Sequence, residues 1–168
     1  MQARMDDPAP RAHSPVVRAW LSRRPGQLIG KGHPAGDFLE AYEWAVLEES
    51  SGVLRLRAHV PAHVKNPRGQ IFGGFTPTYV DLVALLTVRA GEQRLEQRFR
   101  TWLATLNMRV EYFEPIVGPE FGIESRLIKQ RGQTHFVETR FYDPGDTLAV
   151  LAFTTLREIS LDGALGDG

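Results

Sequence analysis

The segment NPRGQIFGGFTPTYVDLVALLTV, residues 66–88, decides the fold of this chain. Its only charged side chain between Arg68 and Arg89 is Asp81, which has apolar neighbours on every side. A helix that is apolar on all faces is expected inside a protein rather than on its surface. We therefore predict a buried helix from about Phe75 to Gly91, with Thr76 and Pro77 in its first turn. A lone buried carboxylate is strongly unfavourable, so we expect Asp81 to open onto a cleft and to have a function there.

Strand patterns stand on both sides of this helix. The expected strands are Glu40–Glu49, Val53–Val60, Thr101–Phe113, Glu120–Lys129, Thr134–Tyr142 and Thr147–Ile159. Tight turns are indicated at Ser51-Gly52 and Arg131-Gly132-Gln133, and the short connections predict that the last four strands form an antiparallel meander. In the third strand, one face is expected to carry Trp102, Ala104, Leu106, Met108, Val110 and Tyr112. An apolar helix needs a sheet around it, so the predicted class is α+β with a central helix.

The remaining segments divide the chain. Residues 1–37 are rich in Pro, Arg and Gly and form an N-terminal extension, with one helix expected over Val16–Arg24 and capped by Ser14-Pro15. Residues 38–160 form the folded domain, and residues 161–168 are a tail. The first dozen residues and the tail are expected to be mobile, and Glu92–Arg100 reads as a charged linker.

The composition excludes several functions. Twenty basic and 20 acidic residues balance, so there is no electrostatic signature of nucleic-acid binding, and no basic amphipathic helix indicates a membrane surface. The chain has no cysteine, which excludes disulfides and thiolate chemistry. His59 and His63 lack a third clustered ligand, so no metal site is expected. No signal peptide or membrane span is recognisable, and a cytoplasmic protein is expected.

The central segment resembles the PaaI-like group of hotdog-fold acyl-CoA thioesterases. Those proteins carry an Asn, a Gly, an apolar-His-Gly-Gly run and then an acid at a fixed distance. The matching positions here are Asn66, Gly69, Ile71-Phe72-Gly73-Gly74 and Asp81. The stretch Thr105–Tyr112 with Pro115 is similar to the family's second long strand, and Lys129–Thr134 is similar to its later turn. The resemblance extends over about residues 38–159.

This resemblance implies a hotdog fold and hydrolysis of an acyl-CoA thioester without metal or cofactor. It implies that Gly73 supplies an oxyanion N–H at the helix start and that Asp81 is the nucleophile or the general base. Asn66 and Thr105 would orient the reacting groups. The residues expected to bind substrate are Phe72, Gly74, Lys129 and Arg131, the last two with Arg109 as candidates for coenzyme A phosphates.

Structural roles compete with each of these assignments. Two glycines also make a tight helix entry, Asn before Pro starts turns, Thr favours strands, and exposed Lys and Arg are commonly solvated. Phe72 stands where the family has His, and a phenyl ring cannot hydrogen-bond. That departure weakens a dehydratase or hydratase and favours, as the alternative to a thioesterase, a non-catalytic acyl-CoA or lipid binder.

Assembly is predicted from helix geometry. Gly73 and Asp81 are eight residues apart, which is about 12 Å along a helix axis. A donor and a nucleophile must both lie close to one carbonyl group. We therefore predict a homodimer with shared active sites, with further pairing into a tetramer left open.

Overall fold

A computed structural model describes residues 15–92 and 101–160. The expected Ser14 cap, the mobile ends and most of the charged linker lie outside these residues. The helices are α1 (Pro15–Leu21), α2 (Pro34–Phe38) and α3 (Thr76–Val88), with short 3₁₀ turns η1 (Ala41–Glu43), η2 (Ala62–Val64) and η3 (Gly73–Phe75). The strands are β1 (Ala45–Ser50), β2 (Val53–His59), β3 (Thr101–Tyr112), β4 (Glu120–Arg131), β5 (Thr134–Tyr142) and β6 (Leu148–Ser160).

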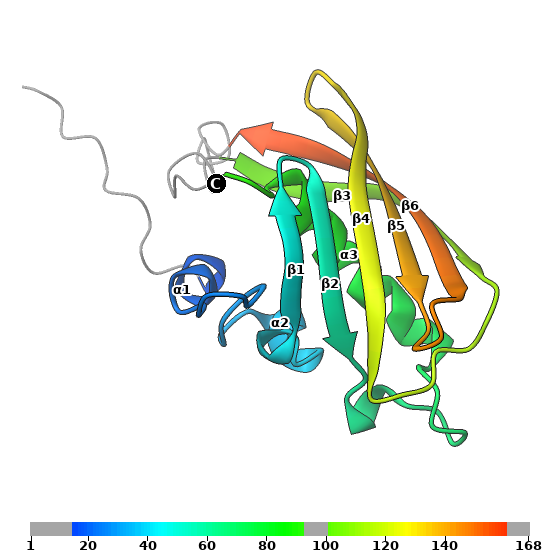
Figure 1. Ribbon diagram of the computed structural model, residues 1–168. Coiled ribbons are helices and arrows are strands. Elements are labelled where there is room, and N and C mark those ends of the chain that lie inside the picture. Colours follow the sequence, from blue (N-terminus) through cyan, green and yellow to red (C-terminus); the bar gives the residue numbers. More distant parts are fainter. Residues whose placement is uncertain (1–14, 93–100, 161–168) are drawn as a thin grey trace, which may run out of the picture.

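One curved antiparallel sheet wraps around α3, in the strand order β1-β2-β4-β5-β6-β3 (Figure 1). The predicted α+β class with a central helix is confirmed. The predicted four-strand meander is wrong, because β3 pairs with β6 and leaves β2 to pair with β4. The chain between β3 and β4 crosses below the start of the helix, where the amide of Ile71 donates to the carbonyl of Ile116 at 3.0 Å. This crossing fixes the loop that leads into the helix.

The helix is buried from its first turn, as expected. Tyr79 has no exposed surface, and its ring stacks on Trp44 at a centroid distance of 5.4 Å. Burial, together with the nearby charge of Glu40, raises the pKa of Tyr79, so the phenol keeps its proton and donates to the carbonyl of His59 at 3.1 Å. A buried donor that finds an acceptor fixes the depth and rotation of α3 against β2.

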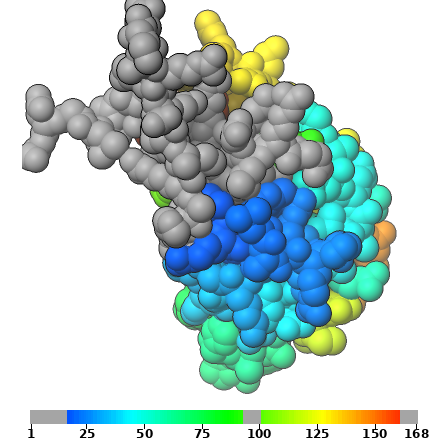
Figure 2. All heavy atoms as spheres, turned by 90° about the vertical axis from the view of Figure 1, so that its left-hand side faces the viewer, coloured from blue at the N-terminus to red at the C-terminus, as the bar shows by residue number. Residues whose placement is uncertain are grey.

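The two edges of the sheet differ. The N-terminal segment lies beside β1 (Figure 2), where the amide of Val46 donates to the carbonyl of Gly26 at 2.8 Å and Gln27 bridges Ala45. The other edge, β3, has no strand on its outer side among residues 15–92 and 101–160. A long strand with an unpaired edge is a template for pairing with another chain.

The N-terminal part of the chain also corrects two expectations. Helix α2 was not predicted, although His33 before Pro34 is its cap: the His33 Nδ1 accepts from the amide of Gly36 at 3.1 Å. The first strand begins at Ala45 rather than at Glu40, because Glu40 has a left-handed backbone (φ 53°) and begins the turn η1. The side chain of Glu40 bonds His59 at 2.6 Å.

A β-bulge changes the faces of β3. The register against β6 shifts between Thr105 and Asn107, so that Leu106 is the extra residue. The predicted single apolar face is therefore wrong. Trp102 pairs with Ile159 on the outer face, whereas Tyr112 pairs with buried Val150 on the face toward the helix. The bulge is also what turns Thr105 toward α3.

Candidate functional site

Asp81 meets Thr105 between the helix and the edge strand. The Thr105 hydroxyl donates to Oδ1 of Asp81 at 2.5 Å, and both side chains keep contact with solvent. The carboxylate is thus half-buried and hydrogen-bonded rather than lost in the core. The bond occupies one carboxylate oxygen, and no other hydrogen bond reaches the Asp81 side chain within the described part of the chain. The second oxygen is available to a water or a substrate.

The helix start offers unused hydrogen-bond donors. Gly73 and Gly74 are both exposed, and their N–H groups have no acceptor among residues 15–92 and 101–160. The carbonyls beside them are used: Phe72 accepts from the amide of Phe75 at 2.8 Å, and Gly73 accepts from the amide of Thr76. Because the carbonyl and the N–H of a trans peptide point in opposite directions, the two free N–H groups face out of the helix start, where an anion is favoured.

Aromatic rings surround these glycines. Phe72 is 53% exposed, and its ring lies over Gly74, so that a Cβ there would come within 2.8 Å of the ring. The same ring meets Phe75 at 5.7 Å in an edge-on arrangement. From β3, the hydroxyl of Tyr112 donates to the carbonyl of Gly73 at 2.8 Å. The donors therefore stand between two exposed rings, one from the loop and one from the edge strand.

The other predicted site residues lie farther out. Asn66 closes its own loop, with Oδ1 accepting from the amides of Arg68 (2.9 Å) and Gln70 (3.1 Å) and Nδ2 donating to the Gln70 side chain. Lys129 and Arg131 are at the end of β4. That end lies past Ser125, which contacts Thr87 near the last turn of α3, so within one chain both cations are at the opposite end of the helix from Gly73. Arg109 bonds Glu111 at 2.6 Å on the outer face.

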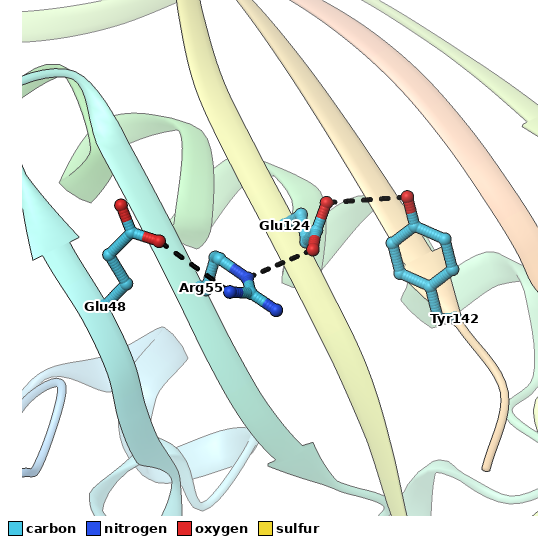
Figure 3. Close-up of polar contacts among 4 residues, drawn as sticks. All are labelled: Glu48, Arg55, Glu124 and Tyr142. Atoms are coloured by element: carbon cyan, nitrogen blue, oxygen red, sulfur yellow. Dashed lines mark hydrogen bonds and ion pairs between the residues drawn. The ribbon is translucent and has the colours of Figure 1, made fainter. Parts of the chain in front are cut away.

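A hollow of about 350 Å³ lies away from these residues. It lies on the outer face of the sheet over β2, β4 and β5. There Arg55 bonds Glu48 and Glu124, and the Glu124 carboxylate also meets the hydroxyl of Tyr142 (Figure 3). These exposed groups satisfy one another, and the sheet separates them from Asp81. Neither this hollow nor a smaller one lined by Glu124, Arg126, Glu138 and Arg140 includes Asp81 in its lining.

Two features are absent from residues 15–92 and 101–160, the part of the chain that the structure describes. No group of three or more His, Cys, Asp or Glu side chains could hold a metal ion. None of the helices is both long and apolar enough to cross a membrane.

Sequence reasoning missed Tyr112 as a site residue. It appeared only as one apolar position in an alternating strand, and the bulge at Leu106 reversed the face on which it was expected. Nothing in the local pattern distinguishes a tyrosine that reaches a carbonyl from one that fills a strand face.

Comparison with solved structures agrees with this architecture. A hypothetical thioesterase protein from Streptococcus pneumoniae, solved with coenzyme A, aligns with a TM-score of 0.60 at 15% identity over 70% of this chain and 87% of its own. A thioesterase from Haemophilus influenzae gives 0.63 at 12% identity, over 76% and 83%. A conserved protein from Pseudomonas aeruginosa gives 0.63 at 18% identity, over 76% and 94%. At these identities the likeness establishes the fold. No curated protein sequence matches this chain.

The molecule is therefore a hotdog-fold protein of the kind found among thioesterases. Its residues 68–150, a segment that contains both glycines, Asp81 and Thr105, match the family model of the Thioesterase superfamily.

Proposed function

We propose that the protein hydrolyses acyl-CoA thioesters to a free acid and coenzyme A. The observation that carries this proposal is the hydrogen bond between Asp81 of α3 and Thr105 of β3, inside the segment that matches the superfamily. Two unused N–H donors lie in η3, the turn that leads into the same helix. The coenzyme A in the Streptococcus pneumoniae structure is consistent with the choice of thioester.

The chemistry assigns one task to each group. Thr105 holds one oxygen of Asp81, and the other oxygen either attacks the thioester carbonyl or takes a proton from the attacking water. The N–H of Gly73 stabilises the charge that develops on the carbonyl oxygen. Coenzyme A leaves as a thiolate and then takes up a proton. Since a thiol has a pKa of about 8.5, this leaving group needs little acid catalysis. Where Asp81 is the nucleophile, water then hydrolyses the acyl–Asp81 anhydride, which releases the free acid and restores the carboxylate.

We further propose that two copies share each site. Gly73 and Asp81 are about 12 Å apart along one helix, and the open edge of β3 is the natural pairing surface. Tyr112, which touches Gly73, lies opposite Val150 on β6, and Thr105, which touches Asp81, lies opposite Leu156. If the β3 strands of two copies pair antiparallel, Asp81 of one copy approaches Gly73 of the other when Tyr112 lies opposite Thr105 of the partner subunit.

That condition fixes the register. Arg109 pairs with Phe153 on β6, midway between Leu156, the partner of Thr105, and Val150, the partner of Tyr112. The two-fold axis therefore passes through Arg109, and the Arg109 residues of the two copies lie opposite each other. Met108 and Val110 then face each other across the axis on the helix side. In this dimer, the end of β4 of one copy lies at the same height as the start of α3 of the other copy. Lys129 and Arg131 of one copy therefore remain candidates to bind the phosphates of a coenzyme A at the helix start of the other.

The chain has no cysteine, so one introduced cysteine tests the register. Arg109→Cys is expected to form a dimer-linking disulfide under mild oxidation, since directly opposed antiparallel residues fall within disulfide reach. Glu111→Cys is the matched control: it breaks the same Arg109–Glu111 ion pair but moves the thiols about 13 Å apart along the strands. Equal cross-linking of both variants, or none of Arg109→Cys, contradicts the proposed register.

A panel of short, medium, long and aromatic acyl-CoAs tests the activity. Free thiol is measured with a thiol-specific dye, to which a cysteine-free protein contributes no background. Turnover of at least one class is expected. Phe72, in place of the family's His, favours the second candidate, a binder without turnover. In that case the acyl-CoAs raise the melting temperature but release no thiol.

A further inference from the structure

Tyr112 connects the edge strand to the start of the helix. Its hydroxyl donates to the carbonyl of Gly73 at 2.8 Å, and its ring lies 3.7 Å from where a Cβ of Gly73 would be. The side chain is 52% exposed. It therefore contributes little to the core, and its one described hydrogen bond is made to the glycine that carries a free N–H.

This bond acts on the orientation of the donors. Glycine leaves the backbone unusually free to rotate, and two consecutive glycines begin this helix. The carbonyl of Gly73 is held on one side by the amide of Thr76 and on the other by the Tyr112 hydroxyl. Fixing that carbonyl fixes the plane of the Gly73–Gly74 peptide, and with it the direction of the N–H at Gly74 and the rotation available to Gly73.

We propose that Tyr112 is a positioning residue for the oxyanion donors, acting through the carbonyl of Gly73 rather than by touching the reacting atoms. The inference rests on the proposed thioesterase function. Preorganised donors stabilise the transition state without reorganising during the reaction, so loss of the hydroxyl is expected to lower kcat and leave KM unchanged. One neutral hydrogen bond contributes about 1 kcal/mol, equivalent to about a fivefold fall in kcat.

Tyr112 also relates this site to assembly, because it belongs to the strand whose free edge we propose as the dimer interface. In the register above, it faces Thr105 of the partner subunit. Pairing of the two strands would therefore cover this exposed tyrosine and restrain further the donors that it already holds in the single chain.

The test compares Tyr112→Phe with Tyr142→Phe. Both remove one tyrosine hydroxyl, but that of Tyr142 meets Glu124 on the outer face at 3.5 Å (Figure 3). Expected results are a fivefold lower kcat at unchanged KM for Tyr112→Phe and wild-type kinetics for Tyr142→Phe. A second measurement needs no activity: the amide nitrogen resonance of Gly74 should shift in Tyr112→Phe, because the preceding carbonyl loses a hydrogen bond, and should not shift in Tyr142→Phe.

The outcomes separate the two proposals. If wild type hydrolyses acyl-CoA and Asp81→Asn does not, but Tyr112→Phe matches wild type in kcat, the positioning role is overturned and the function stands. If KM rises at constant kcat, Tyr112 binds substrate and the positioning role is again wrong. If wild type releases no thiol from any acyl-CoA, the proposed function fails and the catalytic role of Tyr112 fails with it, while the Gly74 resonance still shows whether the hydroxyl holds the carbonyl.

Discussion

Two sets of polar groups where helix α3 meets the sheet, one near its last turn and one at its middle, differ in how completely they are paired. Near the last turn, the Thr87 hydroxyl is 2.7 Å from the carbonyl of Val83 and 2.8 Å from the hydroxyl of Ser125, which is 3.0 Å from that of Thr139. Thr87, Ser125 and Thr139 have no exposed surface. This chain of hydroxyls is closed, and every member has a partner.

The set at the middle and the start of the helix, which consists of Asp81, Thr105 and the N–H groups of Gly73 and Gly74, is open in the sense that some of its polar groups have no partner. Thr105 satisfies one oxygen of Asp81, and the glycine N–H groups have no acceptor in the described structure. Buried polar groups are almost always paired, and the Thr87 set follows that rule. Polar groups that are held firmly on one side and left unpaired on the other are typical of sites that receive a ligand. From this difference we expect the first set to contribute to stability and the second to function.

The largest effect that sharpens this comparison is expected from Asp81→Asn. The amide keeps the shape of the side chain and can still accept from Thr105, but it can neither attack a carbonyl nor take a proton. Hydrolysis is expected to fall by about two orders of magnitude or more, the scale of a lost base or nucleophile. Kinetics of thiol release with the best acyl-CoA of the panel measure it.

Stability provides the control for that variant. Removal of a half-buried charge should leave the melting temperature of Asp81→Asn unchanged or raised. Near wild-type turnover by a well-folded Asp81→Asn would falsify the assignment of Asp81, and the middle of the helix would then be as structural as its last turn.

A smaller effect of the opposite kind is expected from Thr87→Val. The replacement keeps the volume but leaves Ser125 with only Thr139 and removes the second donor to the Val83 carbonyl, which keeps the amide of residue 87 as its helical donor. Loss of such a partner costs about 1–2 kcal/mol in the free energy of unfolding, which is about tenfold in the folding equilibrium. Urea unfolding measures it, and turnover per folded molecule is expected to equal that of wild type. A variant that is fully stable but slow would remove the distinction between the two sets.

The sequence predicted the open set better than its surroundings. Asp81 was recognisable because an acid in a helix apolar on all sides is physically unusual, and Thr76 and Pro77 indicated the helix start. The spacing of Asp81 from Gly73 was recognised only through the family resemblance. The contact with Thr105 was expected only through the family resemblance. Strand order was mispredicted, because short connections permit a hairpin without requiring one, and β3 reached the far edge. The bulge at Leu106 has no local signature in this strand, which is why the role of Tyr112 could not be inferred.

The smallest effect is expected at the rim of the open set, from Phe72→Ala. The ring is 53% exposed and lies over Gly74, so it covers a substrate more than it supports the core. Burial of one methylene group contributes about 0.8 kcal/mol, which is about fourfold in kcat/KM. Loss of the ring should therefore change the ratio of kcat/KM between short and long acyl-CoAs by about fourfold for each methylene group of the acyl chain that it no longer covers. Phe153→Ala, which removes a 46% exposed ring from the outer face, is the matched control and should leave the ratio unchanged. A uniform fall in rate across the panel, with the ratio unchanged, would show that Phe72 supports the glycine donors instead of contacting the acyl chain. In that case Phe72 would help to hold the N–H donors of Gly73 and Gly74 in place, and other residues would determine the acyl preference.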